Sequence, residues 1–246
     1  MKRFLIALQF LTIIPVKIKP PIKKEDLGAS LLYFPLVGVL IGGVLALCAV
    51  VLAPFSALFR AAVILIISVL ITGGIHLDGF ADTCDAFYGN NPKDKILEIM
   101  RDSHIGAMGA AGMVSVLLLK FSIIAGFSEE LLWRVLILTA VFSRWSQVLA
   151  CRGASYARED GKGRYFMEYA TKQALLSGFF FTAALFYLFF KLEGFVLFFA
   201  SLLPVLLLLQ YMKKRIGGMT GDTIGALSEF AEVSILLLAF FMHLAY

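Results

Sequence analysis

Seven long apolar stretches alternate with polar segments along the chain, at about residues 29–53, 61–77, 105–126, 132–150, 174–190, 195–212 and 224–245. A helix needs about 20 apolar residues to cross the hydrocarbon core of a bilayer, and each stretch is close to that length. The apolar residues 3–14 are too few to span and end at Pro15, which predicts an interfacial or re-entrant helix. The pattern therefore predicts an all-α, polytopic integral membrane helical bundle of about seven transmembrane helices, with residues 1–246 forming one domain.

Composition supports the membrane class. Hydrophobic residues make up 60% of the chain and charged residues 16%, and the mean hydropathy is +0.89. No soluble core of this size hides so much apolar surface. The net charge of +5 comes with lysines and arginines in the segments 78–104, 151–173 and 213–223, which the positive-inside rule assigns to the cytoplasm. We expect a protein of the cytoplasmic (inner) membrane that contacts lipid and no nucleic acid; the sequence leaves open whether it is a homo-oligomer.

Three carboxylates follow the second apolar stretch. Asp78, Asp82 and Asp85 are spaced by four and seven residues, so on a helix they lie within an arc of roughly 60°. Like charges this close repel unless a cation neutralises them, and oxygen ligands suit Mg²⁺ or Mn²⁺. The alternative is a solvated acidic helix start, which the helix dipole favours. Acids at the end of a membrane span are costly, which favours the metal site.

A second acidic segment follows. Asp94, Glu98 and Asp102 recur every four residues on a short helix expected at about 92–102. For the first two an ordinary solvated helix face is an equal alternative. Asp102 precedes Gly106 and Gly109, which permit close approach of a ligand, so we expect a second metal or substrate contact there. The histidines at 76 and 104 flank the acidic segment; either is a candidate general base, although a single histidine more often orients its neighbours.

The glycine-rich segment 217–225 is the third candidate. Its free backbone N–H groups, and a helix expected to start near Asp222, suit a phosphate. A flexible turn is the alternative. Glu229 and Glu232 continue into the last span and need a partner inside the membrane, either a metal or a basic residue such as Arg144.

The segment 151–172 is basic. It combines arginines and lysines with tyrosines and glycines, which suits a nucleotide diphosphate because arginine binds phosphate in a bidentate manner. Positive-inside bias with contact to anionic lipid explains the same residues without a substrate.

Three ordered blocks resemble one known family. Residues 73–85 (GGIHLDGFADTCD), 99–106 (IMRDSHIG) and 217–222 (GGMTGD) are similar to the signature blocks of cobalamin synthase, also called the adenosylcobinamide-GDP ribazoletransferase family. The similarity extends over nearly the whole chain, including LQFLTIIP at 8–15 and the loop 157–163. At Cys84 and His104 the chain departs from the family pattern. The resemblance implies a membrane-embedded, Mg²⁺-dependent enzyme that joins adenosylcobinamide-GDP to α-ribazole or its 5′-phosphate and releases GMP.

The implied chemistry assigns roles to the residues above. The expected metal ligands are Asp78, Asp82, Asp85, Asp102 and Asp222. The expected catalytic residues are Asp82, Asp78 and His76, and which of them acts as base is left open. The expected substrate-binding residues are Arg101, Arg158, Lys162, Arg164, Gly218, Thr220 and Gly221.

Two other functions remain as alternatives. A CDP-alcohol phosphatidyltransferase also places aspartates in a membrane, but its pattern has arginine after the alanine, where this chain has Asp82. An ion-coupled transporter would bind its cation near the bilayer midplane within repeated, broken helices, whereas most acids here lie at one interface and no repeat is visible. We expect the three blocks to meet in one cytoplasm-facing site, with glycines at the span ends bringing Asp222 near Asp82.

Overall fold

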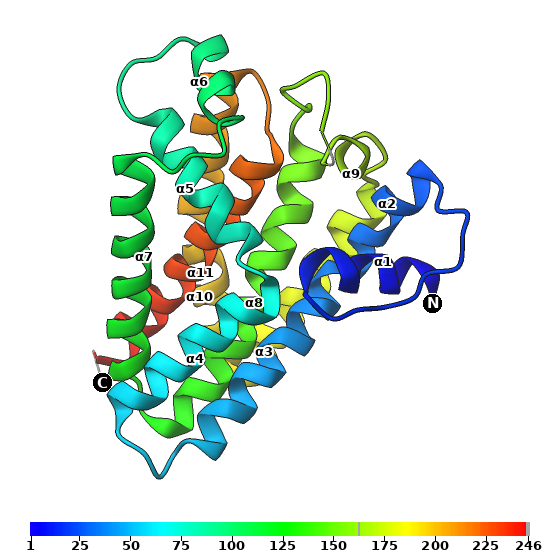
Figure 1. Ribbon diagram of the computed structural model, residues 1–246. Helices are drawn as coiled ribbons and strands as arrows, with labels where there is room; N and C mark the ends of the chain where they lie inside the picture. The colour runs from blue at the N-terminus through cyan, green and yellow to red at the C-terminus, as the bar shows by residue number, and fades with distance from the viewer. Residues whose placement is uncertain (162, 245–246) are drawn as a thin grey trace.

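The computed structural model describes residues 1–161 and 163–244, and within that part the chain is a bundle of helices without strands (Figure 1). The elements are α1 (Lys2–Leu11), α2 (Lys24–Ser30), the 3₁₀ turn η1 (Leu31–Tyr33), α3 (Phe34–Val51), α4 (Ala57–Thr72), α5 (Ile75–Phe87), α6 (Lys93–Ile99), α7 (Ala107–Gly126), α8 (Glu129–Gly153), α9 (Arg164–Glu168), α10 (Lys172–Ile216) and α11 (Gly221–Leu244). The prediction of an all-α bundle is confirmed.

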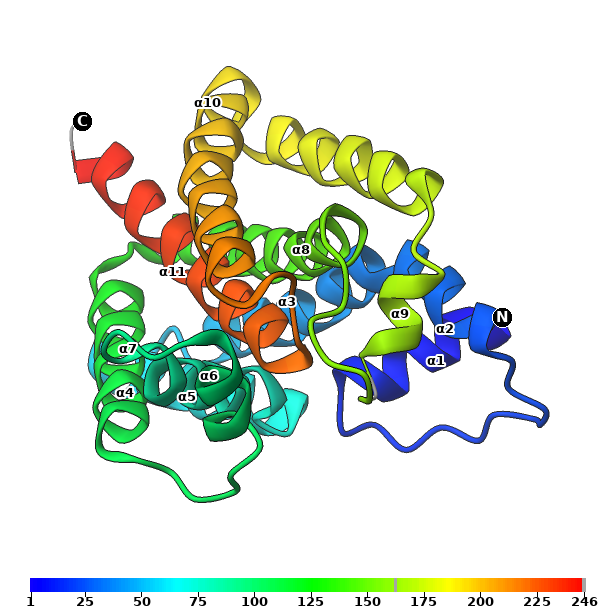
Figure 2. The ribbon, with the colours of Figure 1, turned by 90° about the horizontal axis from the view of Figure 1, so that it is seen from above.

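Five helices of the described chain are long and apolar enough to cross a membrane, or six if the bent pair α4 and α5 counts as one span. The predicted count of seven is therefore not confirmed. The predicted spans at 174–190 and 195–212 both fall within α10, whose backbone breaks at Lys191 (φ 53°, ψ −130°). Three residues later, a side chain on Gly194 would collide with the carbonyl of Phe186, so the chain turns back tightly there. Figure 2 shows the two legs of α10 diverging from this turn.

The bend between α4 and α5 sets the direction of the acidic block. Gly73 and Gly74 have positive φ angles of 64° and 68°, a region that glycine enters without the steric cost that other residues meet. The two helices consequently meet at 91°. The sequence predicted an uninterrupted span to residue 77, because the hydropathy of an apolar run gives no information on a bend of the backbone within it. The break comes earlier and places Asp78 in the first turn of α5.

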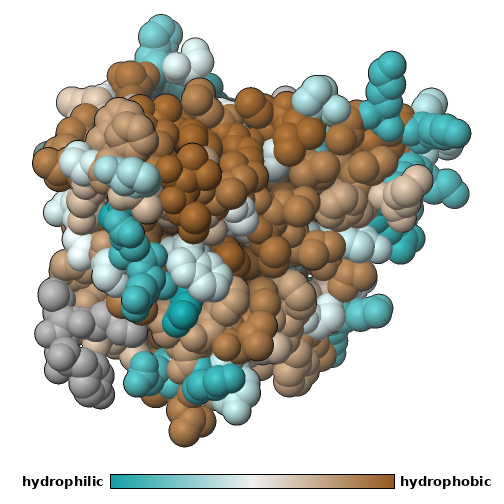
Figure 3. Space-filling model, turned by 90° about the horizontal axis from the view of Figure 1, so that it is seen from below, coloured by the Kyte–Doolittle hydropathy of each residue, from teal (hydrophilic) through white to brown (hydrophobic). Residues whose placement is uncertain are grey.

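Helix α8 lies at the centre of the bundle, and most of its residues after Leu132 are buried. Glycines allow α3 to approach it closely: a Cβ on Gly38 would lie 2.7 Å from the carbonyl oxygen of Ala140, and one on Gly42 would lie 2.6 Å from the Cα of Ile137. This spacing of small residues is typical of helix pairs in membranes. Apolar side chains also cover much of the face seen from below, as expected for a surface in lipid (Figure 3).

Helix α1 is too short to span and lies across the bundle beside α2 (Figure 1). It buries Ile6, Leu8 and Leu11, and Lys2 donates a hydrogen bond of 2.8 Å to the carboxylate of Asp26 on α2. An amphipathic helix held in this way fits the interfacial segment that the sequence predicts.

Candidate functional site

The segments that the sequence singled out lie at one end of the bundle (Figure 1). Tyr156 and Met219 form an isolated parallel bridge, in which the N–H of Ala157 donates to the carbonyl of Met219 and the N–H of Met219 donates to the carbonyl of Ser155, both at 2.9 Å. Gly218 lies so close to the backbone of Ser155 that any side chain would collide with it. The basic loop and the glycine-rich loop therefore form one surface, which confirms that they share a side of the bundle.

Helices α5 and α11 cross through glycines at this end. A Cβ on Gly79 would lie 2.8 Å from the Cα of Asp222, and one on Gly225 would lie 3.2 Å from the Cα of His76. Larger residues at these positions would separate the helices. The glycines therefore bring the acidic block of α5 beside the first turn of α11, as the sequence predicted.

A cavity of about 270 Å³ opens at this crossing. Its lining combines residues of the acidic block of α5, the basic loop and the first turn of α11 with aromatic side chains from α1, α3 and α9. The lining residues are Phe10, Phe34, Ile75, His76, Asp78, Gln147, Cys151, Tyr156, Arg158, Gly161, Gly163, Phe166, Gly221, Asp222, Ile224 and Gly225. A few polar groups converging in a mostly apolar hollow are typical of a ligand site.

Arg158 is the positively charged residue that lines this cavity in the described part of the chain. Its guanidinium donates a 2.8 Å hydrogen bond to the carboxylate of Asp222 and a 3.3 Å bond to the carbonyl of Met100. Its Nε is buried and has no partner within the described chain. Burial raises the pKa of the neighbouring Tyr156 phenol, which therefore stays protonated as a donor. The site thus offers several donors to an anionic ligand.

Asp78 and Asp82 differ from the other acids of the site, because neither has a hydrogen-bond or ion-pair partner in the described part of the chain. The negative charges of Asp78 and Asp222 both act on the carboxyl group of Asp82, so the three groups lie near one another. Their oxygen donors suit Mg²⁺. Among the described residues, no three acidic, histidine or cysteine side chains are close enough to enclose a metal alone. A bound Mg²⁺ would therefore need ligands from the substrate, and Mg²⁺ commonly takes phosphate oxygens in that way.

Asp85 has a different environment from the other two acids of its block. Its carboxylate accepts hydrogen bonds from the backbone N–H groups of Gly106 (2.7 Å) and Gly109 (2.8 Å), at the start of α7. A side chain on either glycine would collide with that carboxylate. The acid therefore caps α7, satisfying N–H groups that have no partner within their own helix.

Asp102 lies outside the cavity. Helix α6 ends at Ile99, before the predicted end at 102, so Asp102 is in an exposed loop. It accepts a 3.0 Å hydrogen bond from the N–H of His104 and lies 2.6 Å from that imidazole, and these contacts lower its pKa. Arg101 lines the same open surface hollow as Asp102. Its positive charge also acts on the phenol of Tyr156, which lines the cavity.

The remaining predicted residues are distributed as follows. Arg164 lies outside the lining and donates a 2.6 Å bond to the carbonyl of Glu159. Thr220 is buried, and its hydroxyl accepts a 3.2 Å bond from the N–H of Thr223, which caps α11. Gly221 lines the cavity. The Lys162 prediction lies outside the described residues.

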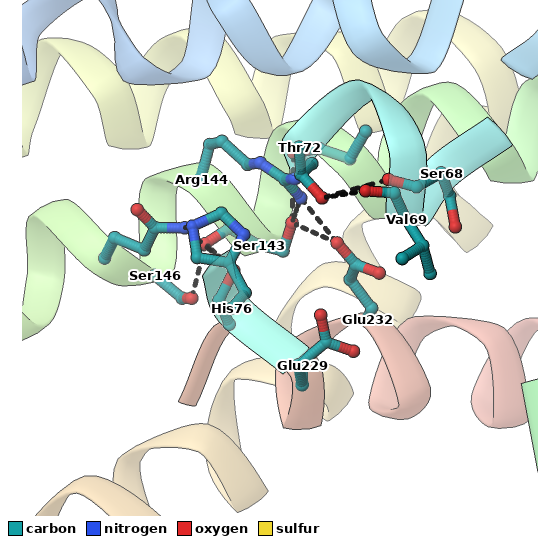
Figure 4. A network of polar contacts seen from close by, with 12 residues as sticks. Ser68, Val69, Thr72, His76, Ser143, Arg144, Ser146, Glu229 and Glu232 are labelled. Atoms are coloured by element: carbon teal, nitrogen blue, oxygen red, sulfur yellow. Dashed lines mark hydrogen bonds and ion pairs between the residues drawn. The ribbon is translucent and has the colours of Figure 1, made fainter. Parts of the chain in front are cut away.

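His76 lines the cavity but is buried, with its Nε2 at 3.0 Å from the amide nitrogen of Gln147. The same amide nitrogen donates a 2.8 Å bond to the hydroxyl of Ser228. Figure 4 shows the side chain of His76 beside α8, the helix that carries Ser143, Arg144 and Ser146. The imidazole is thus held by a neutral neighbour, a geometry that suits an orienting residue as well as a base.

Sequence reasoning missed Gln147 and also Lys120 of α7. The lysine is the larger omission because it carries a charge. Its ammonium group contacts the carboxylates of Glu229 and Glu232 on α11, at 2.7 Å for the second. Arg144 of α8 pairs with Glu232, and Figure 4 shows the two side chains pointing at each other. The prediction that Arg144 is a counter-ion is confirmed. A single lysine within the apolar run 114–124 was the signal that could have identified the other partner.

Comparison with known proteins gives a match over nearly the whole chain. The family described as "Cobalamin-5-phosphate synthase" matches residues 3–240. Proteins named "Adenosylcobinamide-GDP ribazoletransferase" are similar throughout: that of Clostridium acetobutylicum is 34% identical, with 96% of this chain and 94% of the relative covered. The one from Alkaliphilus metalliredigens is 38% identical over the same shares, and that of Desulfitobacterium hafniense is 36% identical, with 98% and 97% covered. No solved structure matches the chain.

Proposed function

The chain belongs to the cobalamin-5-phosphate synthase family, and we propose from this premise that it catalyses the joining of adenosylcobinamide-GDP to α-ribazole or its 5′-phosphate in the cavity described above. It is a membrane enzyme of the final steps of cobalamin synthesis. One observation supports the location of the chemistry: Asp78 and Asp82, two carboxylates without partners among the described residues, lie near Arg158 and Asp222, where a cavity opens between the acidic block, the basic loop and the glycine-rich segment.

The reaction exchanges one phosphoester bond for another. A ribose hydroxyl of the acceptor attacks the phosphorus on the cobinamide side of the diphosphate, a new P–O bond forms, and the bond to GMP breaks. GMP leaves with the electron pair, and the hydroxyl proton passes to a base. The negative charge that develops on the phosphoryl oxygens is the feature that the site must stabilise.

The side chains of the cavity meet these needs in different ways. Arg158 lines the cavity and supplies guanidinium donors that suit a phosphate, and the N-terminus of α11 at Gly221 adds positive partial charge. Asp78 is exposed at the cavity and has a carboxylate free to accept the hydroxyl proton. Tyr156 has a protonated phenol for a further hydrogen bond.

We also propose Mg²⁺ as the cofactor, which Asp78, Asp82 and Asp222 would hold only together with oxygens of the diphosphate, because no three such side chains of the described residues could enclose a metal by themselves. When bound, it would neutralise charge on the diphosphate and orient it. The fit rests on the donor set: all three groups are carboxylates, two of them have no partner within residues 1–161 and 163–244, and the charges of Asp78 and Asp222 act on Asp82. Asp85 and Asp102 each have other partners, so we place them outside this set.

We further propose that the site faces the cytoplasm from the cytoplasmic membrane. The basis is the lysine and arginine content of the three segments at this end of the bundle, compared with the connections expected on the other side, which hold only Arg60 and Lys191 beside Glu129, Glu130 and Glu193. This orientation would give access to nucleotide substrates and return GMP to the same compartment.

The function is tested with the purified full-length protein in detergent. Adenosylcobinamide-GDP, α-ribazole and Mg²⁺ are added, and GMP and the corrinoid product are quantified by chromatography. We expect equal amounts of the two products with Mg²⁺ and none after chelation by EDTA, with recovery when Mg²⁺ is restored. Because detergent removes any transmembrane gradient, turnover would exclude obligatory ion-coupled transport. Absence of GMP from a folded protein would contradict the proposal.

A pair of arginine substitutions tests the donor site. Arg158→Ala removes charge-assisted hydrogen bonds, each worth about 1.5–3 kcal/mol, so the KM for adenosylcobinamide-GDP should rise by roughly 10- to 100-fold. Arg164→Ala removes an exposed side chain whose polar partners among the described residues lie in its own segment, at Glu159 and Glu168, and should change that KM by less than about twofold.

Steady-state kinetics with each substrate varied in turn provide the measurement. The KM for α-ribazole should stay nearly constant in both variants. Equal effects of Arg158→Ala on both substrates, or equal effects of the two variants on the donor, would show that the basic loop does not select the diphosphate.

A further inference from the structure

A second hollow lies beside the first, at the 91° bend between α4 and α5. It has a volume of about 630 Å³ and is open to the outside; we call it the bend groove. Its walls come from the end of α1, the Gly73–Gly74 turn and, on the far side, Met113 of α7. The segment after α1 is fixed against this turn, because the N–H of Ile13 donates a 2.9 Å hydrogen bond to the carbonyl of Ile71.

The bend groove and the Arg158 cavity meet at the acidic block. Phe10, Ile75 and Asp78 line both hollows. Asp78 is exposed and has no partner among the described residues. A molecule in either hollow could therefore contact the same carboxylate.

The two hollows differ in charge. Arg158 lines the first, whereas Asp78 is the only charged side chain that lines the bend groove in the described chain. The other polar residues there are neutral: Gln9 has an exposed side chain without a partner in the described chain, and Thr12 and Thr72 have hydroxyl groups that retain acceptor capacity. Apolar side chains such as Met113 complete the wall.

Such a lining suits an uncharged molecule with a flat apolar ring and a few hydroxyl groups, and offers nothing to a diphosphate. Methionine adapts its shape to aromatic rings, and the neutral polar groups can bind sugar hydroxyls. Pockets of several hundred Å³ are the size that encloses a nucleoside-sized ligand.

We propose that the bend groove binds the base and ribose of the nucleoside acceptor, α-ribazole, a proposal that rests on the function proposed above. Phosphoryl transfer requires the attacking and leaving oxygens to lie roughly in line through the phosphorus. The diphosphate is expected beside Arg158, and the bend groove meets that cavity at Asp78, so an acceptor in the groove can bring its hydroxyl to the phosphorus from a separate hollow.

Two substitutions test the proposal in the full-length protein. Met113→Trp fills the bend groove, and Gln9→Ala removes a polar side chain that has no partner in the described chain. We expect Met113→Trp to raise the KM for α-ribazole at least about tenfold, Gln9→Ala about threefold, and neither to change the KM for adenosylcobinamide-GDP by more than about twofold.

The matched control is Met108→Trp, the same change one and a half turns earlier on α7, at an exposed residue outside the lining of both hollows. It should leave both KM values within about twofold of wild type. Thermal unfolding of each variant in detergent establishes that it is folded before kinetics are interpreted.

A binding measurement separates this proposal from the proposed function. Calorimetry with α-ribazole alone, without donor or Mg²⁺, should give binding to the wild type and to Asp82→Asn, and at least tenfold weaker binding to Met113→Trp. The proposal is overturned if Met113→Trp raises the KM for the donor more than that for the acceptor, or if it changes neither binding nor kinetics. If the wild type makes no GMP but binds α-ribazole in this way, the proposed reaction fails and the bend groove remains a nucleoside site.

Discussion

Asp82→Asn should lower kcat by roughly a thousandfold while the melting temperature stays within about 3 °C of wild type. Asp82 is proposed to hold Mg²⁺, and loss of a group that stabilises the charge developing in a transition state costs up to about 4 kcal/mol, which corresponds to this factor. The carboxylate has no protein partner in the described chain, and its charge is opposed by those of Asp78 and Asp222. Its removal should therefore leave folding unchanged or slightly improved. Asp78→Asn should behave in the same way.

Asp85→Asn is the matched control, because it makes the same chemical change one turn further along α5. Here the carboxylate accepts bonds from the N–H groups of Gly106 and Gly109, and an amide nitrogen would face one of those donors. Loss of such a cap costs about 1–2 kcal/mol, so the melting temperature should fall by roughly 3–6 °C, with kcat reduced much less than in Asp82→Asn. GMP release and thermal unfolding, measured on the same samples, separate the two roles. An unfolded Asp82→Asn protein, or an Asp85→Asn protein with intact stability and no turnover, would reverse the assignment.

The sequence predicts much of this fold because the membrane imposes a length on each apolar run. The stretches at 105–126 and 132–150 correspond closely to α7 and α8. The number of spans could not be predicted in the same way. The two glycines at 73–74 bend one run through 91°, and the α10 break at Lys191 occurs without proline or glycine at that residue. Hydropathy measures transfer into lipid and carries no information on backbone angles.

The candidate site, like the fold, could be predicted only in part from the sequence. Spacing correctly predicted that α5 presents its acids beside Asp222, because helical periodicity fixes which residues share a face. It could not distinguish Asp82 from Asp85, since both lie on that face. Their difference depends on whether a distant helix start supplies N–H donors, which is a property of the packed bundle.

The buried charges of the membrane interior were only partly predictable. Two acids in the last span required a cation, and Arg144 was the expected one. The structure adds Lys120 as a second cation. The positive side chains of Lys120 and Arg144 thus pair with the negative side chains of Glu229 and Glu232, and the net charge of this group is zero. This balance is what allows four charges to remain buried.

Lys120→Met should therefore destabilise the protein more than any other substitution considered above. The ammonium group is buried between two carboxylates, and removing it leaves one of them without its cation. Breaking a buried ion pair from one side costs about 3–5 kcal/mol, enough to lower the melting temperature by roughly 10 °C or to prevent recovery of folded protein. Thermal unfolding in detergent, with the yield of monodisperse protein as a second measure, gives the result.

The double variant Lys120→Met with Glu229→Gln tests the charge balance behind that expectation. It removes one charge of each sign, leaves Arg144 paired with Glu232, and should recover at least about half of the lost stability, since neutral replacements of both partners often cost little. Lys95→Met serves as the control on an exposed lysine, whose pair with Glu98 at the surface should contribute less than about 1 kcal/mol. If the double variant is no more stable than Lys120→Met alone, the lysine acts through packing of its side chain and the neutral charge sum is not what holds α7 against α11.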